Sequence, residues 1–423
     1  MRRPTRILEP RHFANFHCLG GDCEDTCCDG WAVTIDQPTF EKYQNCPDAG
    51  WRASFDQFVK IQPAGASAHD YARIELASTT CPFLTEGWCA IHKELGEEYL
   101  SVTCDRFPRV WNVVDDVLEQ SLDLGCPEAA RVALLDPEPM AFREEAGVAE
   151  KFTTMRIAAI DTAAGAGQAK PYRHFGAVRG FVIRLLQNRA LPLWKRLLIL
   201  GFFCDKVQEM AGAAEAQIPD LVLAYEQAVA AGLFDDTVNQ LGARTAVQLE
   251  TVLELVVARI TSDFTNKRFL ACYKEFMDGI GWGANSTMAE IDARNREAYA
   301  RYCGPFLNRH EHILEHYLVN YVGRTLFPFG PQESTYTLRD QNIERSIHAE
   351  FLLLAVYFAI IQTLLTGVAG FHKEAFGAAQ VIQVIYTFTR TFEHSLTFPQ
   401  RVMQTLAEKG LDNPAGVAVL VRV

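Results

Sequence analysis

Residues 351–370, FLLLAVYFAIIQTLLTGVAG, form an apolar stretch without a charged residue, and they largely decide the fold. A helix of about 20 apolar residues is long enough to cross a membrane, so the stretch has two interpretations. However, Gln362, two threonines and two glycines interrupt it, and no other segment of the sequence resembles it. These features favour a buried central helix over a membrane span, and we expect no span.

Several other segments of the second part of the chain carry apolar residues at three- and four-residue spacing, which is the pattern of amphipathic helices. They are residues 174–189, 191–212, 246–261, 310–327 and 378–395. No glycine-rich loop follows a strand and precedes a helix, and the glycine-containing residues 163–171 read as a loop. The sequence therefore predicts a mostly α protein whose multi-helical C-terminal domain covers residues 131–423, without a Rossmann fold.

The first part of the chain is rich in cysteine and looks irregular. Nine of the twelve cysteines lie in residues 1–126, and a proline-rich acidic segment, residues 134–145, reads as a link to the next element. We therefore predict an N-terminal cysteine-rich domain over residues 1–130. Its expected elements are strands at 31–36 and 72–77, short helices at 37–44 and 92–100, and a hairpin at 109–124 that turns at Asp115–Asp116.

The net charge of the chain and its first residues indicate the compartment and limit the kinds of partner. The formal charge is -12, which argues against non-specific nucleic-acid binding because such binding needs a basic surface. Residues 1–16 contain no apolar run of signal-peptide length. We therefore expect a cytoplasmic protein, in which thiols stay reduced and disulfides are disfavoured. The oligomeric state is left open.

The cysteines form two blocks, and their spacing favours a metal site over scattered structural thiols or disulfides. The first block has the spacing C-x4-C-x3-C-C, and the second is widely spaced; their members are Cys18, Cys23, Cys27, Cys28, Cys81, Cys89, Cys104 and Cys126. Thiolates that converge on a small volume bind zinc or an iron–sulfur cluster. The absence of C-x2-C pairs favours iron–sulfur, with zinc as the alternative, and one or two sites are possible. The C-x3-C-x2-C pattern of radical enzymes is not met, because Gly30 stands at its third position.

Several of these motifs resemble known families. Residues 18–36, 81–96 and 104–110 are similar to a cysteine-rich zinc- or iron-chelating domain. Together with YLVNYVGRTLFPFG (317–330) and FTRTFEHS (388–395), they resemble the bacterial flagellin lysine N-methylases. The likeness extends over most of the chain.

The resemblance implies an enzyme that methylates the ε-amino groups of flagellin surface lysines in the cytoplasm. It implies S-adenosylmethionine as the methyl donor and an iron–sulfur cluster, of the four-iron type, as a cofactor. Because no Rossmann signal is present, we expect the donor to bind a different scaffold, with the cluster nearby. The alternatives are a non-catalytic metal-binding or chaperone protein with a helical interaction domain, and a redox protein, for which no flavin or nicotinamide site is visible.

Lysine must lose a proton before its nitrogen attacks a methyl group, so the site needs a base or a desolvating, acidic or aromatic pocket. The candidates in the helical part are Glu393, His394 and Tyr321 for catalysis and Arg390, Asn320 and Tyr317 for donor binding. On a helix, Arg390 shares a face with Glu393 and His394. These residues also have purely structural interpretations. In one, Arg390 and Glu393 form an ion pair within the helix in place of a site; in the other, the tyrosines pack in the core.

His312 and His316 also share a helix face near His310, a spacing that suits a metal. Without a supporting glutamate motif, such histidines are more often part of the surface or of a satisfied core.

Overall fold

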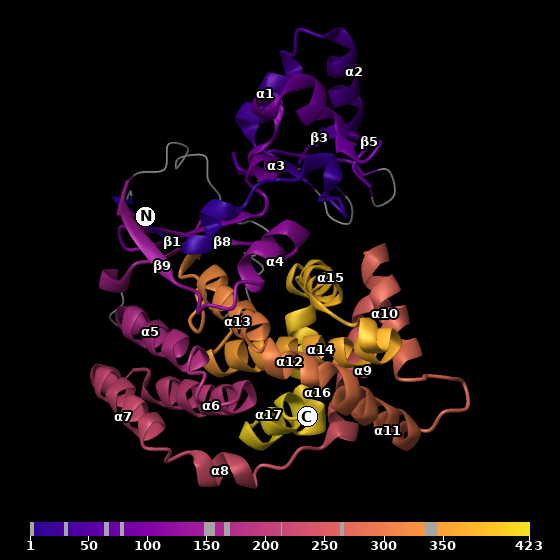
Figure 1. The fold of residues 1–423 in the computed structure, drawn as a ribbon. Coiled ribbons are helices and arrows are strands. Elements are labelled where there is room, and N and C mark those ends of the chain that lie inside the picture. Colours follow the sequence, from indigo (N-terminus) through magenta and orange to yellow (C-terminus); the bar gives the residue numbers. More distant parts are fainter. Residues whose placement is uncertain are drawn as a thin grey trace.

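The computed structural model describes residues 4–28, 33–62, 67–76, 80–147, 157–164, 170–212, 214–262, 266–334 and 345–423. A small lobe from the first part of the chain stands out from a larger helical body, and a sheet lies where the two meet (Figure 1). The mostly α prediction is confirmed. The largest sheet in the described chain mixes parallel and antiparallel pairs, unlike a Rossmann sheet.

Helix α14, Ile347–His372, is the central helix that the sequence predicts. It begins at Ser346, whose side chain accepts a hydrogen bond from the Ala349 N–H. The helix is apolar and long enough to cross a membrane, but its apolar window is wholly buried inside the protein. The other helices pack around it, and a core helix of this kind passes the same hydropathy test as a membrane span.

Helix α10, Lys267–Gly279, crosses α14 at a very short distance. A Cβ atom built on Gly279 would lie 1.8 Å from the carbonyl oxygen of Gly367, and one on Gly367 would lie 2.3 Å from Cδ2 of Phe276. Only glycine lets two backbones approach so closely. The two glycines of the apolar stretch therefore serve helix contact, which explains why they interrupt an otherwise aliphatic sequence.

We expect Gly367→Ala to lower the free energy of unfolding by about 1–3 kcal/mol, because the added methyl group overpacks the crossing. Gly176→Ala is the matched control, since its Cβ would meet nothing within 4 Å. Its expected change is neutral or slightly stabilising. Urea unfolding followed by circular dichroism measures both, and equal stability of the two variants would contradict a tight crossing.

The predicted helical segments are confirmed, with ends that shift by a few residues. The helices of this part are α5 (Phe175–Leu186), α6 (Leu193–Met210), α7 (Ile218–Ala230), α8 (Asp235–Gln240), α9 (Thr245–Ile260), α11 (Met288–Ala298), α12 (Gly304–Arg309), α13 (His312–Thr325), α15 (Ala378–Phe388), α16 (Phe398–Lys409) and α17 (Pro414–Val421). One difference matters for function. The segment 378–395 is not a single α-helix, because α15 gives way to a π-helical turn, Thr389–Glu393, named η11.

The sheet between the lobe and the helices has the order β11-β10-β7-β8-β1-β9. Its strands are β1 (Arg6–Pro10), β7 (Arg109–Val114), β8 (Val117–Leu122), β9 (Phe142–Ala146), β10 (Ala158–Ile160) and β11 (Glu333–Ser334). The predicted hairpin is confirmed as β7–β8, with Val114 opposite Val117. The segment 134–145, predicted as a link or a turn into the next element, leads from helix α4 (Pro127–Leu134) into strand β9, which pairs with β1. Charged side chains hide the edge strand β9 and its neighbour β1 from a hydropathy pattern, and cross-strand ion pairs such as Arg6–Glu144 stabilise them.

The small lobe has its own core. It contains β2 (Thr34–Ile35), α1 (Gln37–Gln44), α2 (Ala49–Phe58), β3 (Val59–Ile61), β4 (Ala72–Ile74), β5 (Leu84–Thr85), β6 (Trp88–Cys89) and α3 (Val102–Arg106). The predicted helix at 37–44 is confirmed, as are strands within 31–36 and 72–77, although residues 31, 32 and 77 lie outside the described part. The predicted helix at 92–100 is wrong: a π-helical turn and a 3-10 turn replace it, because Gly96 between them has a φ of 92°.

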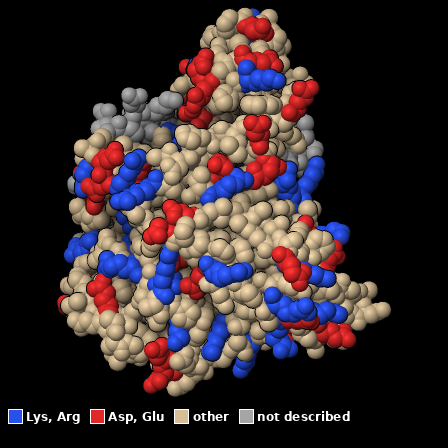
Figure 2. All heavy atoms as spheres, in the orientation of Figure 1, with Lys and Arg blue, Asp and Glu red and all other residues tan. Residues whose placement is uncertain are grey.

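The lobe core is formed by residues between 33 and 104, whereas β7, β8 and α4 (Pro127–Leu134) pack with the helical body. The division of the chain at residue 130 stays a prediction. Charge is mixed over the face drawn in Figure 2, where Lys and Arg are interspersed with Asp and Glu. This face therefore carries no continuous basic patch.

Candidate functional site

The two cysteine blocks meet at Cys28. The Cys81 N–H donates a 2.8 Å hydrogen bond to the carbonyl oxygen of Cys28, which joins the first cysteine loop to the second block. The thiol of Cys28 also shares hydrogen bonds with the thiols of Cys27, Cys81 and Cys89. Four of the eight predicted ligands therefore converge, two from each block.

A glycine pair lets the first loop lie against the hairpin that carries Cys89. A Cβ atom on Gly21 would lie 2.0 Å from Nε1 of Trp88, and Gly20 has a φ of 57°. The indole ring therefore rests directly on the backbone of the loop. Larger side chains at either glycine would push the loop away from β6 and separate the two blocks.

Hydrogen bonds within this cluster lower the pKa values of some thiols and raise that of another. The bond with Cys28 lowers the pKa of Cys27 to about 7 and that of Cys89 to about 6. The same bonds raise the pKa of Cys28. The lowered pKa values of Cys27 and Cys89 favour the thiolate, which is the form that binds metals. Among the described residues, no group of three or more His, Cys, Asp or Glu side chains forms a ready-made metal site.

The other predicted ligands lie around this cluster. Cys104 is half-buried, and burial raises the pKa of its thiol. It also interacts electrostatically with Cys27 and Cys89. Cys126 precedes helix α4, where burial raises its pKa to about 12, against the opposing backbone N–H groups of the helix start. Cys126 interacts with Cys23, and Cys23 with Cys18. The eight thiols therefore form a group of four with Cys104 beside it, and a looser group of three.

Arg390 connects the helical body to the cysteine loop. Its guanidinium is 3.0 Å from a carboxylate oxygen of Asp25 and donates to the carbonyl oxygen of Thr26, both in the first loop. It also donates to the carbonyl oxygen of Gly125, just before Cys126. Arg268 from α10 holds the other Asp25 oxygen at 3.2 Å. The predicted Arg390 thus fixes the loop from which Cys27 and Cys28 project.

Glu393, at the other end of η11, is buried in a network with the helical body. The Tyr317 hydroxyl donates a 2.7 Å hydrogen bond to one carboxylate oxygen, and Arg324 forms an ion pair with the other. An Arg390–Glu393 ion pair does not form, because the two side chains bond on opposite sides of the wide π-helical turn. Tyr317 therefore positions Glu393, and its burial raises its own pKa so that it stays a donor.

His394 lies against Asp123, which follows strand β8. Its Nε2 is 2.9 Å from a carboxylate oxygen of Asp123, and Arg324 is 3.7 Å from the same oxygen. Burial raises the pKa of Asp123, but His394, Arg324 and the Gly125 N–H outweigh burial and lower it overall. Asp123 is therefore a carboxylate, and Arg324 joins the His394 and Glu393 parts of the network.

A cleft of about 230 Å³ opens beside this network. Its wall includes Glu393, Tyr321, Tyr357 and the Arg345–Glu350 ion pair. Burial raises the pKa values of both tyrosines, so both are neutral phenols. Arg324 lines the cleft as well, so each of its two glutamates is paired with an arginine. Of the predicted site residues, Tyr321 and Glu393 thus share an aromatic cleft with two ion pairs.

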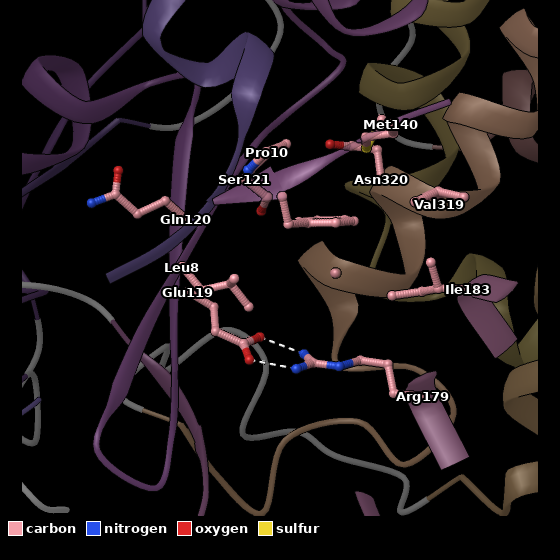
Figure 3. Close-up of a pocket in the computed structure, with 12 residues that line it drawn as sticks. Leu8, Pro10, Glu119, Gln120, Ser121, Met140, Arg179, Ile183, Val319 and Asn320 are labelled. Atoms are coloured by element: carbon pink, nitrogen blue, oxygen red, sulfur yellow. Dashed lines mark hydrogen bonds and ion pairs between the residues drawn. The ribbon is translucent and has the colours of Figure 1, made fainter. Parts of the chain in front are cut away.

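Asn320 faces a different cavity, on the other side of α13. That cavity has about 210 Å³ and lies between β8, β9, α5 and α13 (Figure 3). The Asn320 Nδ2 donates a 3.0 Å hydrogen bond to the carbonyl oxygen of Leu122. Asn320 and Tyr321 are adjacent in the sequence, but they line different cavities. Asn320 is therefore separated from the cleft that Tyr321 shares with Glu393.

Sequence reasoning missed Arg324, Asp123 and Asp25, which the structure places in the network. Arg324 lies seven residues after Tyr317, so both face the same side of α13, and this spacing was available in the sequence. Nothing local in the sequence indicates that Asp123 meets His394 or that Asp25 meets Arg390. Those contacts join residues that are hundreds of positions apart.

The histidines of α13 do not form a metal site within the described residues. His316 is buried and interacts with His312 and with His12 of the N-terminal segment. Burial and the neighbouring His316 lower the pKa of His12 to about 4, against the opposing charge of Asp136. The interpretation of these histidines as core residues is consistent with this packing.

The lowered pKa of His12 predicts a pH-dependent stability. Below the ordinary histidine pKa of about 6.5, His12 binds a proton in the unfolded chain but not in the folded chain. The free energy of unfolding therefore falls as the pH drops towards about 4. We expect the free energy of unfolding to decrease by about 2–3 kcal/mol more in the parent protein than in His12→Gln over this range. Urea unfolding at several pH values measures this, and parallel pH profiles would contradict it.

Comparisons with known proteins agree with these features. The family model described as the FliB lysine N-methylase C-terminal domain matches residues 179–420. Two proteins named Lysine-N-methylase, from Salmonella choleraesuis and Salmonella typhimurium, are each 33% identical over 149 residues, which is 35% of this chain and 37% of theirs. The flagellar biosynthetic protein FliU of Salmonella muenchen is 34% identical over 33% of this chain and 83% of its own length. No solved structure gives a significant match.

The alignment spans little more than a third of the first two relatives, so it bears on their family and not on each detail of their activity. The family model covers more than half of the chain, including α13, η11 and the network between them. On this basis, the chain belongs to the FliB lysine N-methylase family.

Proposed function

We propose that this protein is a protein-lysine N-methyltransferase that methylates ε-amino groups of flagellin surface lysines, with S-adenosylmethionine as the donor. One observation carries the proposal. The turn η11 directs Arg390 towards the cysteine loop and Glu393 into the aromatic cleft beside Arg324. A metal-binding module without catalytic activity would not need the second contact, which places Glu393 in the cleft.

The cleft suits a lysine side chain. Tyr321 and Tyr357 offer aromatic walls for the aliphatic stem and the cationic head, and Glu393 offers a carboxylate. Partial burial of the amine lowers its pKa and favours the neutral nucleophile. Arg324 and Tyr317 hold Glu393 in one orientation, so that a carboxylate oxygen accepts the proton that the amine releases.

His394 and Asp123 are assigned a supporting role. Asp123 holds His394 beside η11 by the bond to Nε2. This fixes the end of the turn that carries Glu393. A methyl transfer reaction releases one proton for each methyl group, and Glu393 is the acceptor for it in the cleft. Arg324, which stays protonated, separates Glu393 from Asp123 and His394, so those two residues position the turn and do not carry the proton.

We further propose that Cys27, Cys28, Cys81 and Cys89 hold an iron–sulfur cluster, with zinc as the alternative metal. The donor set fits, because thiolates are the ligands of both, and the thiols already contact one another through Cys28. When bound, the metal would hold the first cysteine loop and the β5–β6 hairpin together, since four thiolates would complete the coordination of a tetrahedral zinc or of a four-iron cluster. Arg390 positions the loop through Asp25 and Thr26.

The looser group of thiols leaves room for a second site. Cys18, Cys23 and Cys126 lie next to the first four, with Cys104 beside them. Iron and sulfide analysis of an anaerobically purified protein distinguishes one cluster from two, and zinc analysis of the same sample tests the alternative.

The substrate assignment rests on the family and on the flagellar name of the FliU relative. We propose that the enzyme acts on flagellin in the cytoplasm before export. The test is intact-mass spectrometry of flagellin from cells with and without this gene. We expect mass increments of one methylene per methyl group that vanish on deletion and return with the wild-type gene. Flagellin of unchanged mass would overturn the proposal.

A further inference from the structure

The ion pair between Arg345 and Glu350, at the wall of the cleft that holds Glu393, is joined by a single hydrogen bond. The Nε atom of Arg345 donates to Oε1 of Glu350 over 2.9 Å, and within the described part of the chain neither side chain forms another hydrogen bond. None of their other polar atoms is buried without a partner. Both Nη groups of Arg345 and the Oε2 atom of Glu350 are therefore accessible to a ligand, and both residues line the cleft.

Two phenol hydroxyls are also open at this wall. Tyr321 is 4% exposed and Tyr357 is 2% exposed, and both line the cleft. Among the described residues neither hydroxyl has a hydrogen-bond partner, although neither oxygen is sealed off from solvent. Both tyrosines interact electrostatically with Arg345 and Glu350. Because buried polar groups are normally hydrogen-bonded, this set of open groups indicates a polar ligand.

The open groups of the ion pair determine the class of ligand. The two Nη groups of an arginine bind a carboxylate bidentately, whereas an open carboxylate oxygen accepts from an ammonium group. A ligand with a carboxylate alone would leave Glu350 without a partner, and a lysine ammonium alone would leave Arg345 without one. A ligand that satisfies both carries an anion and a cation side by side, as the α-carbon of an amino acid does. The pair therefore fits an α-amino acid zwitterion.

We propose that Arg345 and Glu350 bind the carboxylate and the amino group at the amino-acid end of the methyl donor, an inference that rests on the proposed function. A short aliphatic link separates these groups from the sulfonium, so the cationic sulfur lies against the rings of Tyr321 and Tyr357. Glu393 lines the same cleft. The methyl group and the lysine amine thus meet in one cavity, as direct transfer between them requires.

The cleft is open to solvent where it is lined by Leu396, which is 51% exposed. The nucleoside of the donor and the backbone of the protein substrate can therefore remain at the mouth. A purely structural role for the ion pair would be to fix the start of α14, because Arg345 directly precedes Ser346. Both roles predict a loss of stability when the pair is broken, but only ligand binding predicts the selectivity tested below.

Three ligands test the inference without a mutation. Isothermal titration of the anaerobically purified full-length protein compares S-adenosylhomocysteine with its decarboxylated and its deaminated analogues. We expect each analogue to bind about 10–100-fold more weakly, because each loses charged hydrogen bonds, to Arg345 in one case and to Glu350 in the other. Equal affinities of the three ligands would overturn the inference.

Matched variants assign each group of the ligand to its residue. In Arg345→Gln, the decarboxylated analogue should bind as well as S-adenosylhomocysteine, while the deaminated analogue should still bind more weakly. In Glu350→Gln, the two analogues should exchange these roles. Parallel weakening of all three ligands is the result of a structural role, and it would overturn the inference. The side chain of Arg345 is 34% exposed, so its variant is expected to fold and decides the matter even if Glu350→Gln does not fold.

Arg184→Gln is the control for these variants. Arg184 also forms an ion pair with a glutamate, Glu226, but it lines neither of the two cavities. We expect it to bind the three ligands with the affinities and the selectivity of the parent protein. A loss of selectivity in Arg184→Gln equal to that in Arg345→Gln would overturn the assignment of the carboxylate to Arg345.

The outcomes separate this inference from the proposed function. Methylation of flagellin by a protein that binds the three ligands equally would leave the function standing and overturn the inference. Selective binding without methylation of flagellin would keep the site and overturn the substrate. Absence of S-adenosylhomocysteine binding would overturn the inference, and flagellin of unchanged mass in addition would overturn the function as well.

Discussion

Cys28→Ala is expected to abolish the proposed lysine methylation and to prevent binding of the proposed cluster. Cys28 is the thiol that contacts Cys27, Cys81 and Cys89, so its loss leaves the remaining three without their common partner. Even the outer partners of metal ligands change affinity or activity by about 10–100-fold, so we expect at least a 100-fold loss here. Methylation of flagellin and visible absorbance of the anaerobic protein measure the two effects.

Cys46→Ala is the matched control for this variant. Cys46 is a buried thiol of the same small lobe, in the core with Tyr43 and Phe55, and it is outside the group around Cys28. We expect it to keep the cluster and the activity, with a small loss of stability. Full activity in a folded Cys28→Ala protein that lacks iron and zinc would contradict any role of the metal in methyl transfer.

Glu393→Gln is expected to reduce the rate of methylation by about 10²–10⁴-fold, the usual contribution of a positioned proton acceptor. It also leaves Arg324 buried without its closer carboxylate, with only Asp123 at 3.7 Å. We therefore expect the free energy of unfolding to fall by about 3 kcal/mol. Steady-state kinetics and urea unfolding measure the two effects, and the kinetic loss should lie in kcat.

Two further variants serve as comparisons for Glu393→Gln. Tyr317→Phe removes only the hydroxyl that donates to Glu393, and we expect about 1 kcal/mol of lost stability with a smaller loss of rate. Glu275→Gln changes a surface carboxylate that pairs with His372, and it should alter neither quantity measurably. A Glu393→Gln enzyme with normal kcat would show that the cleft does not hold the reacting amine.

Much of the helical body was predictable from the sequence because its signal is local. An uncharged stretch with two glycines specifies a buried helix, and the glycines match the close crossing with α10. Apolar spacing likewise located α5, α6, α9 and α13. Strand β1 and the edge strand β9 escaped prediction, because their charged side chains pair across strands that are far apart in sequence.

The candidate site was predictable in its residue types but not in its partners. Spacing alone suggested that Arg390 and Glu393 share a helix face, and the π-helical turn η11 instead sends them to different parts of the molecule. The same holds for Asn320 and Tyr321, which are adjacent in sequence but line separate cavities. Adjacent helical positions point about 100° apart, so only packing decides which surroundings each one meets.

The sequence by itself determined the buried helix, the helical class and the two blocks of thiols, because hydrophobic spacing and residue type act over a few positions. The tertiary structure decided that Cys28 joins the two blocks, that Arg390 reaches Asp25, and that Glu393 meets Tyr317 and Arg324. These contacts link residues that lie far apart in the sequence, and Arg390 and Asp25 come from opposite ends of the chain. Their formation depends on how helices and strands pack, which no local pattern records.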